Sequence, residues 1–237
     1  MTTRRRSAAD SRARLLDAAS VEFATHGFAG ASVDRLARRA RLNKAMIYYH
    51  FGSKLGLYRE ILRDMYRRVG ARVETARLDA PTPAAAIERF VAAMVDEASR
   101  HPYFPRVMIR ELADHARHLD DETIRLAVAI PHTLAAIIAA GVAEGRFQPA
   151  NPALTYFSIV GPLIVFFVSK PLRARVTDGP IGAIGDDIGP LGAHIAAGVL
   201  ASLERPVGEQ PSVDARPVAG VASRSSRPAA RPVRSPR

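Results

Sequence analysis

Residues 32–62 read SVDRLARRARLNKAMIYYHFGSKLGLYREIL and contain the start signals of three helices. Ser32 precedes apolar residues at spacings i, i+3, i+4 and i+7, which predicts an N-cap and a short amphipathic helix. A tight turn over 41–43 follows, and Asn43 is placed to cap a second, very short helix. Ser53 then caps a longer helix. Two short helices joined by a tight turn are typical of a helix-turn-helix motif.

The second short helix is too short to be stable alone and bears polar and aromatic residues at positions Lys44, Tyr48, Tyr49 and His50. In a helix-turn-helix, the first helix packs by its apolar face and the second places its N-terminal turns in the major groove. Ser32, Lys44 and Lys54 lie at or beside helix starts, where free N–H groups favour a phosphate. An ordinary helical corner with a solvated basic face has the same spacing, so both interpretations remain open on spacing alone.

Helical periodicity continues on both sides of this stretch, with almost no alternation of period two. Upstream, a helix is expected from about Asp10, as its N-cap, to a stop at Gly27. Downstream, further helices are expected as far as residue 204. The sequence therefore predicts an all-α fold.

Charge divides the chain into three parts. Residues 1–80 have a net charge of +9, residues 81–204 of −3 and residues 205–237 of +5, within a total of +11. A basic part joined to a mildly acidic one indicates a polyanionic partner for the basic part only. The last segment has seven arginines, six prolines and little to bury, so it is expected to be disordered.

The N-terminal run resembles the DNA-binding domain of the tetracycline-repressor (TetR) family. In that family a Thr or Ser starts the second helix, an apolar-Ser/Asn-Lys turn opens the third, and Tyr-x-His-Phe-x-x-Lys closes it. Here these are Ser32, residues 42–44 and residues 48–54. Two departures are Ala45, where Gly is common, and Arg41, where Gly often occupies the turn.

The resemblance implies an N-terminal three-helix helix-turn-helix domain, followed by a larger helical domain for ligand binding and dimerisation. The implied function is a sequence-specific transcriptional regulator, most often a ligand-responsive homodimeric repressor on a palindromic operator of double-stranded DNA. The implied limits are 8–71 for the first domain, with its motif at about 33–52, and 72–204 for the second. The residues implied to contact DNA are Ser32, Lys44, Ala45, Met46, Tyr48, Tyr49, His50 and Lys54.

The C-terminal halves of such proteins enclose an apolar pocket, so a small apolar or amphipathic effector is expected. Apolar and Met-containing segments beside Pro102 are candidates, with Tyr103 or His115 supplying a hydrogen bond. The same spacing is equally typical of an ordinary core. The candidate ligand residues are Phe90, Met94, Tyr103, Phe104, Met108, His115 and Leu134. The uncharged helix 153–169 and the small residues at 196–198 are expected to form the dimer interface.

Other functions find less support. Residues 147–169 carry no charge and offer a membrane anchor as the alternative, although Gly161-Pro162 and several polar residues interrupt them. His115 and His118 have metal-ligand spacing, yet such a cluster is more often a solvated helix end. The chain has no cysteine, which suits a reducing compartment, and we expect a cytoplasmic protein. No catalytic or phosphate-loop motif occurs, so neither an enzyme nor a cofactor is expected.

Overall fold

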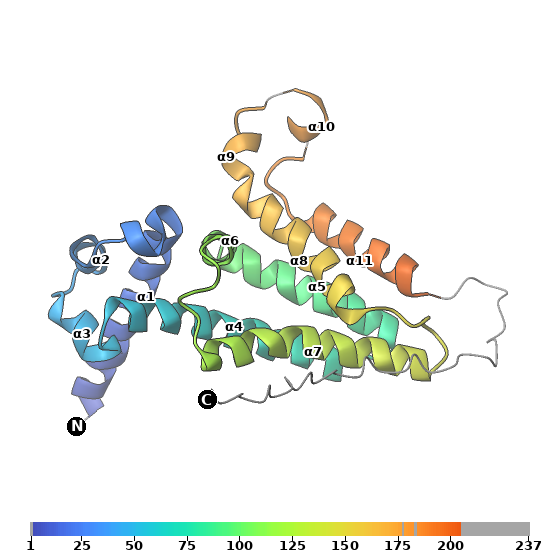
Figure 1. Ribbon diagram of the computed structural model, residues 1–237, viewed down its shortest axis with the longest axis horizontal. Helices are drawn as coiled ribbons and strands as arrows, with labels where there is room; N and C mark the ends of the chain where they lie inside the picture. The colour runs from blue at the N-terminus through green and yellow to red at the C-terminus, as the bar shows by residue number, and fades with distance from the viewer. Residues whose placement is uncertain (1, 177, 183, 205–237) are drawn as a thin grey trace, which may run out of the picture. The chain divides into compact units, whose positions relative to one another are not determined.

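The computed structural model describes residues 2–176, 178–182 and 184–204, and the expectation of disorder for 205–237 lies outside them. The described residues form helices and loops, with one antiparallel bridge between Phe147 and Glu204, and the predicted all-α class is confirmed. The helices are α1 Thr2–Gly30, α2 Val33–Ala40, α3 Ala45–Phe51, α4 Lys54–Leu78, α5 Pro83–Arg100, α6 Phe104–Ala113, α7 Asp121–Ala143, α8 Pro152–Val168, α9 Lys170–Arg173, α10 Gly179–Gly182 and α11 Gly189–Leu203 (Figure 1).

Helix α1 begins at Thr2, so the prediction that Asp10 caps it is wrong. Residues 2–9 contain neither Pro nor Gly, and nothing in them stops a helix from extending toward the N-terminus. The predicted break at Gly27 is confirmed, because its φ of 69° and ψ of 179° are not helical. Glycine adopts this backbone conformation without the steric cost of a Cβ atom.

Residues 2–62, which we call the head, comprise α1, α2, α3 and the first turns of α4. Their apolar faces meet in a common core, as the periodicity predicts. The side chains that are almost fully buried there are Leu15, Ala19, Phe23, Leu36, Ile47, Leu57 and Leu62. This core fixes α2 and α3 against α1.

Residues 63–204, which we call the body, hold the rest of α4 and the helices that follow. Helix α4 runs unbroken through the expected domain limit at residue 71, so head and body share one helix (Figure 1). Within the body, α4 packs against α5 and α7, while α11 packs against α5 and α8. Helix α6 lies between α1 and α8.

Helix α8, which was expected to form part of the dimer interface, is only partly buried in the single chain. Ile159 and Leu163 are buried, whereas Leu154, Phe157 and Val165 are 68%, 65% and 63% exposed. One apolar face of α8 therefore meets solvent unless another molecule covers it.

Among the described helices, α7 is long and apolar enough by length and composition to cross a membrane, whereas α8 has only 17 residues. A span needs about 20 apolar residues. Helix α7 buries Ile130, Leu134 and Ile137 within the body. The core helix of a soluble protein passes the same test of length and composition.

Candidate nucleic-acid interface and ligand cavity

The turn between α2 and α3 is held from outside by Arg14 of α1. Arg41 in the turn adopts the left-handed conformation (φ 52°, ψ 44°), which costs a non-glycine residue about 1–2 kcal/mol. The guanidinium of Arg14 donates hydrogen bonds to the carbonyl oxygens of Ala40 (2.5 Å) and Arg41 (3.2 Å). The N-cap of α3 is Lys44 rather than the predicted Asn43, although Asn43 Oδ1 accepts from the Ala45 N–H at 2.9 Å and so supports the first turn.

The start of α2 is anchored to α1 by Glu22. Its Oε1 atom accepts from the Ser32 N–H (2.9 Å) and from Arg35 Nε (2.8 Å), and its side chain is 5% exposed. Burial raises the pKa of this carboxyl, but the bonds from Ser32 and Arg35 outweigh burial and hold that pKa below its ordinary value. Ser32 Oγ accepts from the Arg35 N–H at 3.4 Å, which confirms the predicted N-cap.

Neither Glu22 nor Arg14 was expected to act at the motif. The available signal for Glu22 is a charged residue between Ala19 and Phe23, which form the apolar face of α1. A carboxylate in such a place needs a partner, because an unpaired buried charge is costly. The sequence gives no indication that the partner lies at the start of the next helix.

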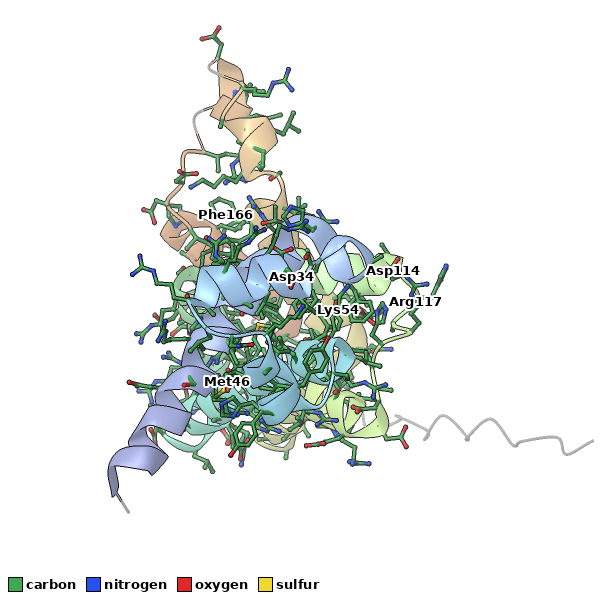
Figure 2. The ribbon with its side chains drawn as sticks, turned by 90° about the vertical axis from the view of Figure 1, so that its left-hand side faces the viewer. Asp34, Met46, Lys54, Asp114, Arg117 and Phe166 are labelled. Atoms are coloured by element: carbon green, nitrogen blue, oxygen red, sulfur yellow. The ribbon has the colours of Figure 1, made fainter. Side chains whose placement is uncertain are left out.

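Helix α3 presents one face to solvent. Tyr48 and Tyr49 are 52% and 76% exposed, and Lys44 and Ala45 at the start of the helix are exposed as well. Lys44 Nζ lies 3.5 Å from a carboxylate oxygen of Asp34, in a pair that is exposed on both sides. The structure thus brings these predicted DNA contacts together on the exposed face of α3. The head, with Met46 and Lys54 labelled, faces the viewer in Figure 2.

Two other predicted contacts on α3 are half-buried. Met46 packs against the core of the head (Figure 2). The Nε2 atom of His50 is buried without a hydrogen-bond partner among the described residues, and the His50 ring meets the Tyr49 ring edge-on at 5.0 Å. The free surface of α3 is therefore formed by its tyrosines more than by Met46.

Lys54 lies against the end of α1 rather than in open solvent. Its Nζ atom is 4.7 Å from the centre of the Phe28 ring and 3.5 Å from the carbonyl oxygen of Ala29. Burial lowers the pKa of Lys54, the charge of Glu22 opposes this effect, and Arg35 adds to it.

The sequence prediction missed two exposed cations on α2. Arg38 and Arg39 are exposed, and neither makes an ion pair with a described residue. The run ARRAR at residues 37–41 was the available signal. Arginines of this kind supply phosphate contacts beside a recognition helix.

A buried polar network joins the head to the body. The Tyr58 hydroxyl donates to Glu111 Oε2 (2.9 Å), and the His118 N–H donates to Glu111 Oε1 (2.9 Å). His118 Nδ1 lies 2.8 Å from Glu111 Oε2, and the His118 ring lies 4.1 Å from the ring of Phe28. Glu111 and His118 are 3% and 8% exposed. The network therefore connects α6 to the end of α1, where Lys54 also lies.

This arrangement corrects the interpretation of residues 114–121 as a solvated helix end. His118 is buried against Glu111, while His115 is exposed, with a φ of 60°. Asp120 accepts from the hydroxyl of Thr123 (2.7 Å) and caps α7, and it pairs with Arg63 of α4. These partnerships explain the cluster without a metal at His115 and His118.

An inner cavity of about 40 Å³ lies among α4, α5, α6, α7 and α8. Three of the predicted ligand residues line it, namely Met94, Phe104 and Met108. The remaining four are elsewhere: Phe90 and Leu134 are fully buried in the core, Tyr103 is 38% exposed, and His115 is exposed in the turn before α7. Their role in ligand binding stays a prediction.

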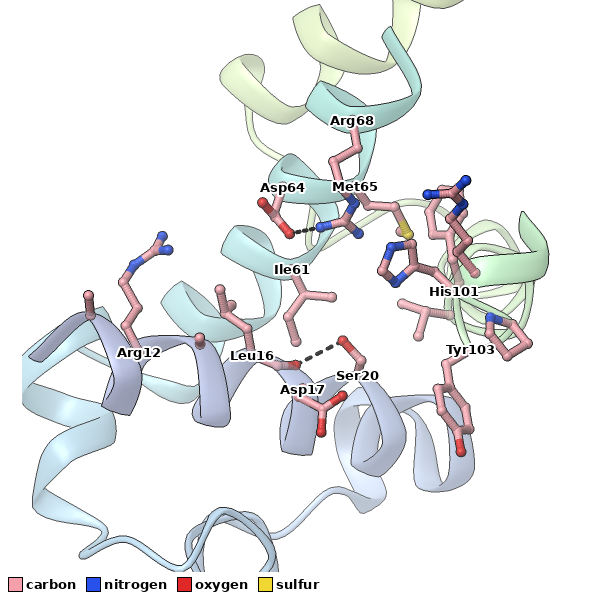
Figure 3. Close-up of a pocket in the computed structure, with 16 residues that line it drawn as sticks. Arg12, Leu16, Asp17, Ser20, Ile61, Asp64, Met65, Arg68, His101 and Tyr103 are labelled. Carbon is pink, nitrogen blue, oxygen red and sulfur yellow. Dashed lines mark hydrogen bonds and ion pairs between the residues drawn. The ribbon is translucent and has the colours of Figure 1, made fainter. Parts of the chain in front are cut away.

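An outer cavity of about 520 Å³ separates α1 of the head from residues 100–107 of the body (Figure 3). Leu16, Ile61 and Met65 line it, beside charged groups that include the paired Asp64 and Arg68 (Figure 3). Arg68 Nε also bonds to Glu97 at 2.7 Å, and Glu97 lines the inner cavity. This ion pair thus links the linings of the two cavities.

Two family models match the chain. Residues 15–61 match bacterial regulatory proteins of the tetR family, and residues 83–177 match the tetracyclin repressor-like C-terminal domain. The chain is 30% identical over 161 residues to the HTH-type transcriptional repressor NicS of Pseudomonas putida, covering 67% of this chain and 76% of NicS. It is 30% identical over 160 residues to the HTH-type transcriptional regulator RutR of Escherichia coli strain K12, covering 67% and 75%.

A solved structure of a tetR family regulator is also similar to this chain. The crystal structure of the TetR family transcriptional regulator PfmR from Thermus thermophilus is 27% identical, with a TM-score of 0.62 over 81% of this chain and 100% of that chain. These matches confirm the resemblance drawn from residues 32–54. A membrane anchor at 147–169 is not supported, because the relatives are DNA-binding regulators and the helix there is short.

Proposed function

Because this chain belongs to the tetR family of bacterial regulatory proteins, we propose that it is a ligand-responsive repressor that binds a palindromic operator as a homodimer. It is a transcriptional regulator and not an enzyme. The observation that carries the proposal is the exposed face of α3 with Tyr48 and Tyr49, on a motif that Glu22 and Arg14 anchor. The proposed site of action is the cytoplasm.

In this proposal, the exposed residues of the head make the principal contacts with DNA. Tyr48 and Tyr49 contact phosphates, with Tyr48 reaching a base edge, and Ala45 faces the floor of the major groove. The remaining predicted contacts, Ser32, Lys44, Met46, His50 and Lys54, position the motif on the backbone or support α3. Arg38 and Arg39 add phosphate contacts from α2, which their exposure supports.

Dimerisation through the body is supported by the uncovered face of α8. A single recognition helix reads few base pairs, and dimers present two helices about one turn of DNA apart. Leu154, Phe157 and Val165 are exposed along one face of α8. On α11, Ala197 and Gly198 are exposed, and a Cβ atom at Gly198 would meet nothing within 4 Å. A second copy covering both helices by two-fold symmetry would bury this surface.

The ligand response is supported by the position of α6 between the inner cavity and the head. Phe104 and Met108 of α6 line the cavity. On the same helix, Arg110 Nη2 donates to the carbonyl oxygen of Thr25 in α1 (3.1 Å), and Glu111 belongs to the network with Tyr58. A ligand that enlarges the cavity displaces α6 and thereby changes the contacts that hold the head, which gives the two states unequal affinity for DNA.

Operator selection from random DNA tests the function directly. We expect the full chain to enrich a palindrome, and Tyr49→Ala to lose at least about ten-fold in affinity for it, because a hydrogen bond to a charged phosphate is lost. The matched control is Tyr103→Ala, which removes a solvent-exposed tyrosine of the body. Enrichment of no sequence, or unchanged affinity of Tyr49→Ala, would contradict the proposal.

Sedimentation tests the dimer. We expect a dimer at micromolar concentration, and a monomer for Phe157→Arg, because a buried unpaired charge at the interface is costly. Ile124→Arg on the exposed side of α7 is the control. A monomeric wild-type chain would contradict this part of the proposal.

A further inference from the structure

Two tyrosines that line the inner cavity, the buried Tyr66 and the half-buried Tyr156, have hydroxyls without a partner among the described residues. Tyr66 and Tyr156 both line the cavity, and Tyr66 is 9% exposed. Neither hydroxyl forms a hydrogen bond with any residue that the structure describes, whereas Tyr58, two turns earlier on α4, donates to Glu111. Neither hydroxyl oxygen is fully enclosed by the described residues, so each can be reached by another molecule, and a phenol on an apolar wall usually bonds to a partner.

The two phenols are close neighbours and both remain neutral. Burial raises the pKa of Tyr66, and the nearby Tyr156 and Glu111 raise it further. Burial alone raises the pKa of Tyr156 to about 12. Both hydroxyls therefore keep their protons at physiological pH and can donate to an acceptor placed between them.

The cavity offers no free charge. Glu97 is its one ionisable acid among the described residues that line it, and that carboxylate is held by Arg68 Nε (2.7 Å) and Arg72 Nε (3.0 Å). The other lining residues are apolar apart from the two tyrosines. A charged ligand would enter this environment without a counter-ion, which is costly, whereas a neutral ligand would not.

The cavity must enlarge to accept an organic molecule. Its volume of about 40 Å³ holds a few water molecules, which is far below the size of a usual ligand pocket. Met94 and Met108 in its wall are flexible and adapt to varied apolar shapes. Phe104 lines both cavities, and its ring meets that of Tyr66 edge-on at 5.7 Å. Movement of Phe104 therefore opens the inner cavity toward the outer one.

We propose that the inner cavity binds a neutral, mainly apolar molecule with one hydrogen-bond-accepting oxygen, such as a ketone, and that Tyr66 and Tyr156 select it through their hydroxyls. This inference rests on the proposed ligand response. It moves the polar contact of the effector from Tyr103 and His115, where the sequence suggested it, to two tyrosines inside the cavity.

A matched pair of probes tests the selection. 4-Ethylacetophenone carries the acceptor oxygen, and 4-ethyl-α-methylstyrene replaces C=O by C=CH₂ with nearly the same shape. Equilibrium dialysis against the full chain without DNA should show the ketone binding about ten-fold more tightly than the hydrocarbon. Tyr66→Phe with Tyr156→Phe should reduce this ratio to about one, while the control Ser99→Ala, which removes an exposed hydroxyl of α5, keeps it. Thermal unfolding of each variant verifies that the fold is retained.

Several results would overturn the proposal. These are equal binding of the two probes, a ratio that survives the double Tyr→Phe variant, absence of ketone binding, or tighter binding of 4-ethylbenzoate or 4-ethylbenzylamine. Operator binding is measured separately. Tyrosine-dependent ketone binding that leaves the operator bound would support the ligand class and contradict the ligand response, so the two failures are distinguishable.

Discussion

The two ends of α2 in the head and the inner cavity of the body differ in how their polar groups are paired. In the head, Glu22 accepts from the start of α2 and Arg14 donates to its end, so both ends of the helix before the recognition helix are held. In the body, the hydroxyls of Tyr66 and Tyr156 have no partner among the described residues. The comparison indicates a head that is already shaped to read DNA and a body that keeps adaptable polar groups for a ligand.

The contact between the head and the body combines a hydrogen-bonded network with a strained turn. In the Tyr58, Glu111 and His118 network both oxygens of Glu111 are bonded, and the turn that precedes His118 contains His115 and Ala116 with left-handed φ values of 60° and 56°. Residues that are not glycine adopt this conformation at a cost of about 1–2 kcal/mol. The turn before α7 therefore stores strain at the end of α6, beside the contact with the head.

The largest expected effect tests the anchoring of the head. Glu22→Ala leaves the Ser32 N–H and the Arg35 guanidinium without their acceptor, so we expect the free energy of unfolding to fall by about 3 kcal/mol in urea titrations. Asp17→Asn, at an exposed carboxylate of the same helix, should change it by less than about 0.5 kcal/mol. Equal losses for the two variants would show that the head is not held in this way.

A pH series tests how much the pairing of Asp120 stabilises the body. The Thr123 hydroxyl and N–H, together with Arg63, hold the pKa of Asp120 at about 2 against the cost of its burial. Since this pKa is lowered on folding, the stabilisation is present above about pH 4 and is lost as the pH falls toward 2. Asp120→Asn should lower the free energy of unfolding by about 2 kcal/mol at pH 6, and the difference from wild type should vanish near pH 2.

The control for that series is Asp121→Asn, at the exposed neighbouring residue in the first turn of α7. It should leave the pH profile of unfolding nearly unchanged. A wild-type profile for Asp120→Asn would mean that the cap of α7 and the bond to α4 contribute little to the stability of the body.

The third test fills the inner cavity of the body with larger side chains. Met94→Phe with Met108→Phe fills the inner cavity, so binding of 4-ethylacetophenone should weaken about ten-fold, while unfolding changes by about 1 kcal/mol or less. Dialysis and urea titration measure the two quantities. Ile109→Phe, on the exposed face of α6, is the control. Unchanged binding by the double variant would place the ligand elsewhere, with the outer cavity as the next candidate.

The smallest effect concerns Lys54 at the junction. We expect Lys54→Ala to weaken binding to all DNA sequences alike and to lower the slope of log affinity against log salt by about 1, because one phosphate contact is lost. Lys170→Ala, which removes an exposed cation of the body, should leave the slope unchanged. A loss confined to operator DNA would show that Lys54 stays on Phe28 and acts through the position of α1.

The parts of the site that were predicted correctly depend on neighbours in sequence. Ser32 and Ser53 were identified correctly as caps, because a cap accepts from an N–H group only three residues further on. Gly27 was identified as a break because its backbone conformation is local. Asp10 has the chemistry of a cap, but capping also requires that the preceding residues leave the helix, and here they continue it.

The ligand residues show where periodicity stops being informative. Phe90 and Met94 lie on the same apolar face of α5, yet Phe90 is fully buried in the core and Met94 lines the cavity. The pattern indicates which side of a helix is buried and does not distinguish filled from empty space. Tyr66 and Tyr156 were missed for the same reason, since an aromatic residue on an apolar face is typical of the core.

Residue order was sufficient for the all-α class, for the caps Ser32 and Ser53 and for the exposure of Tyr48 and Tyr49, because caps and apolar spacing act over one or two helical turns. The partners of Glu22, Glu111 and Asp120, and the residues that surround the inner cavity, emerged only from the folded chain. These groups are brought together by helices distant in sequence, and their pairing depends on how whole helices pack. Residue spacing along one helix carries no information about that packing.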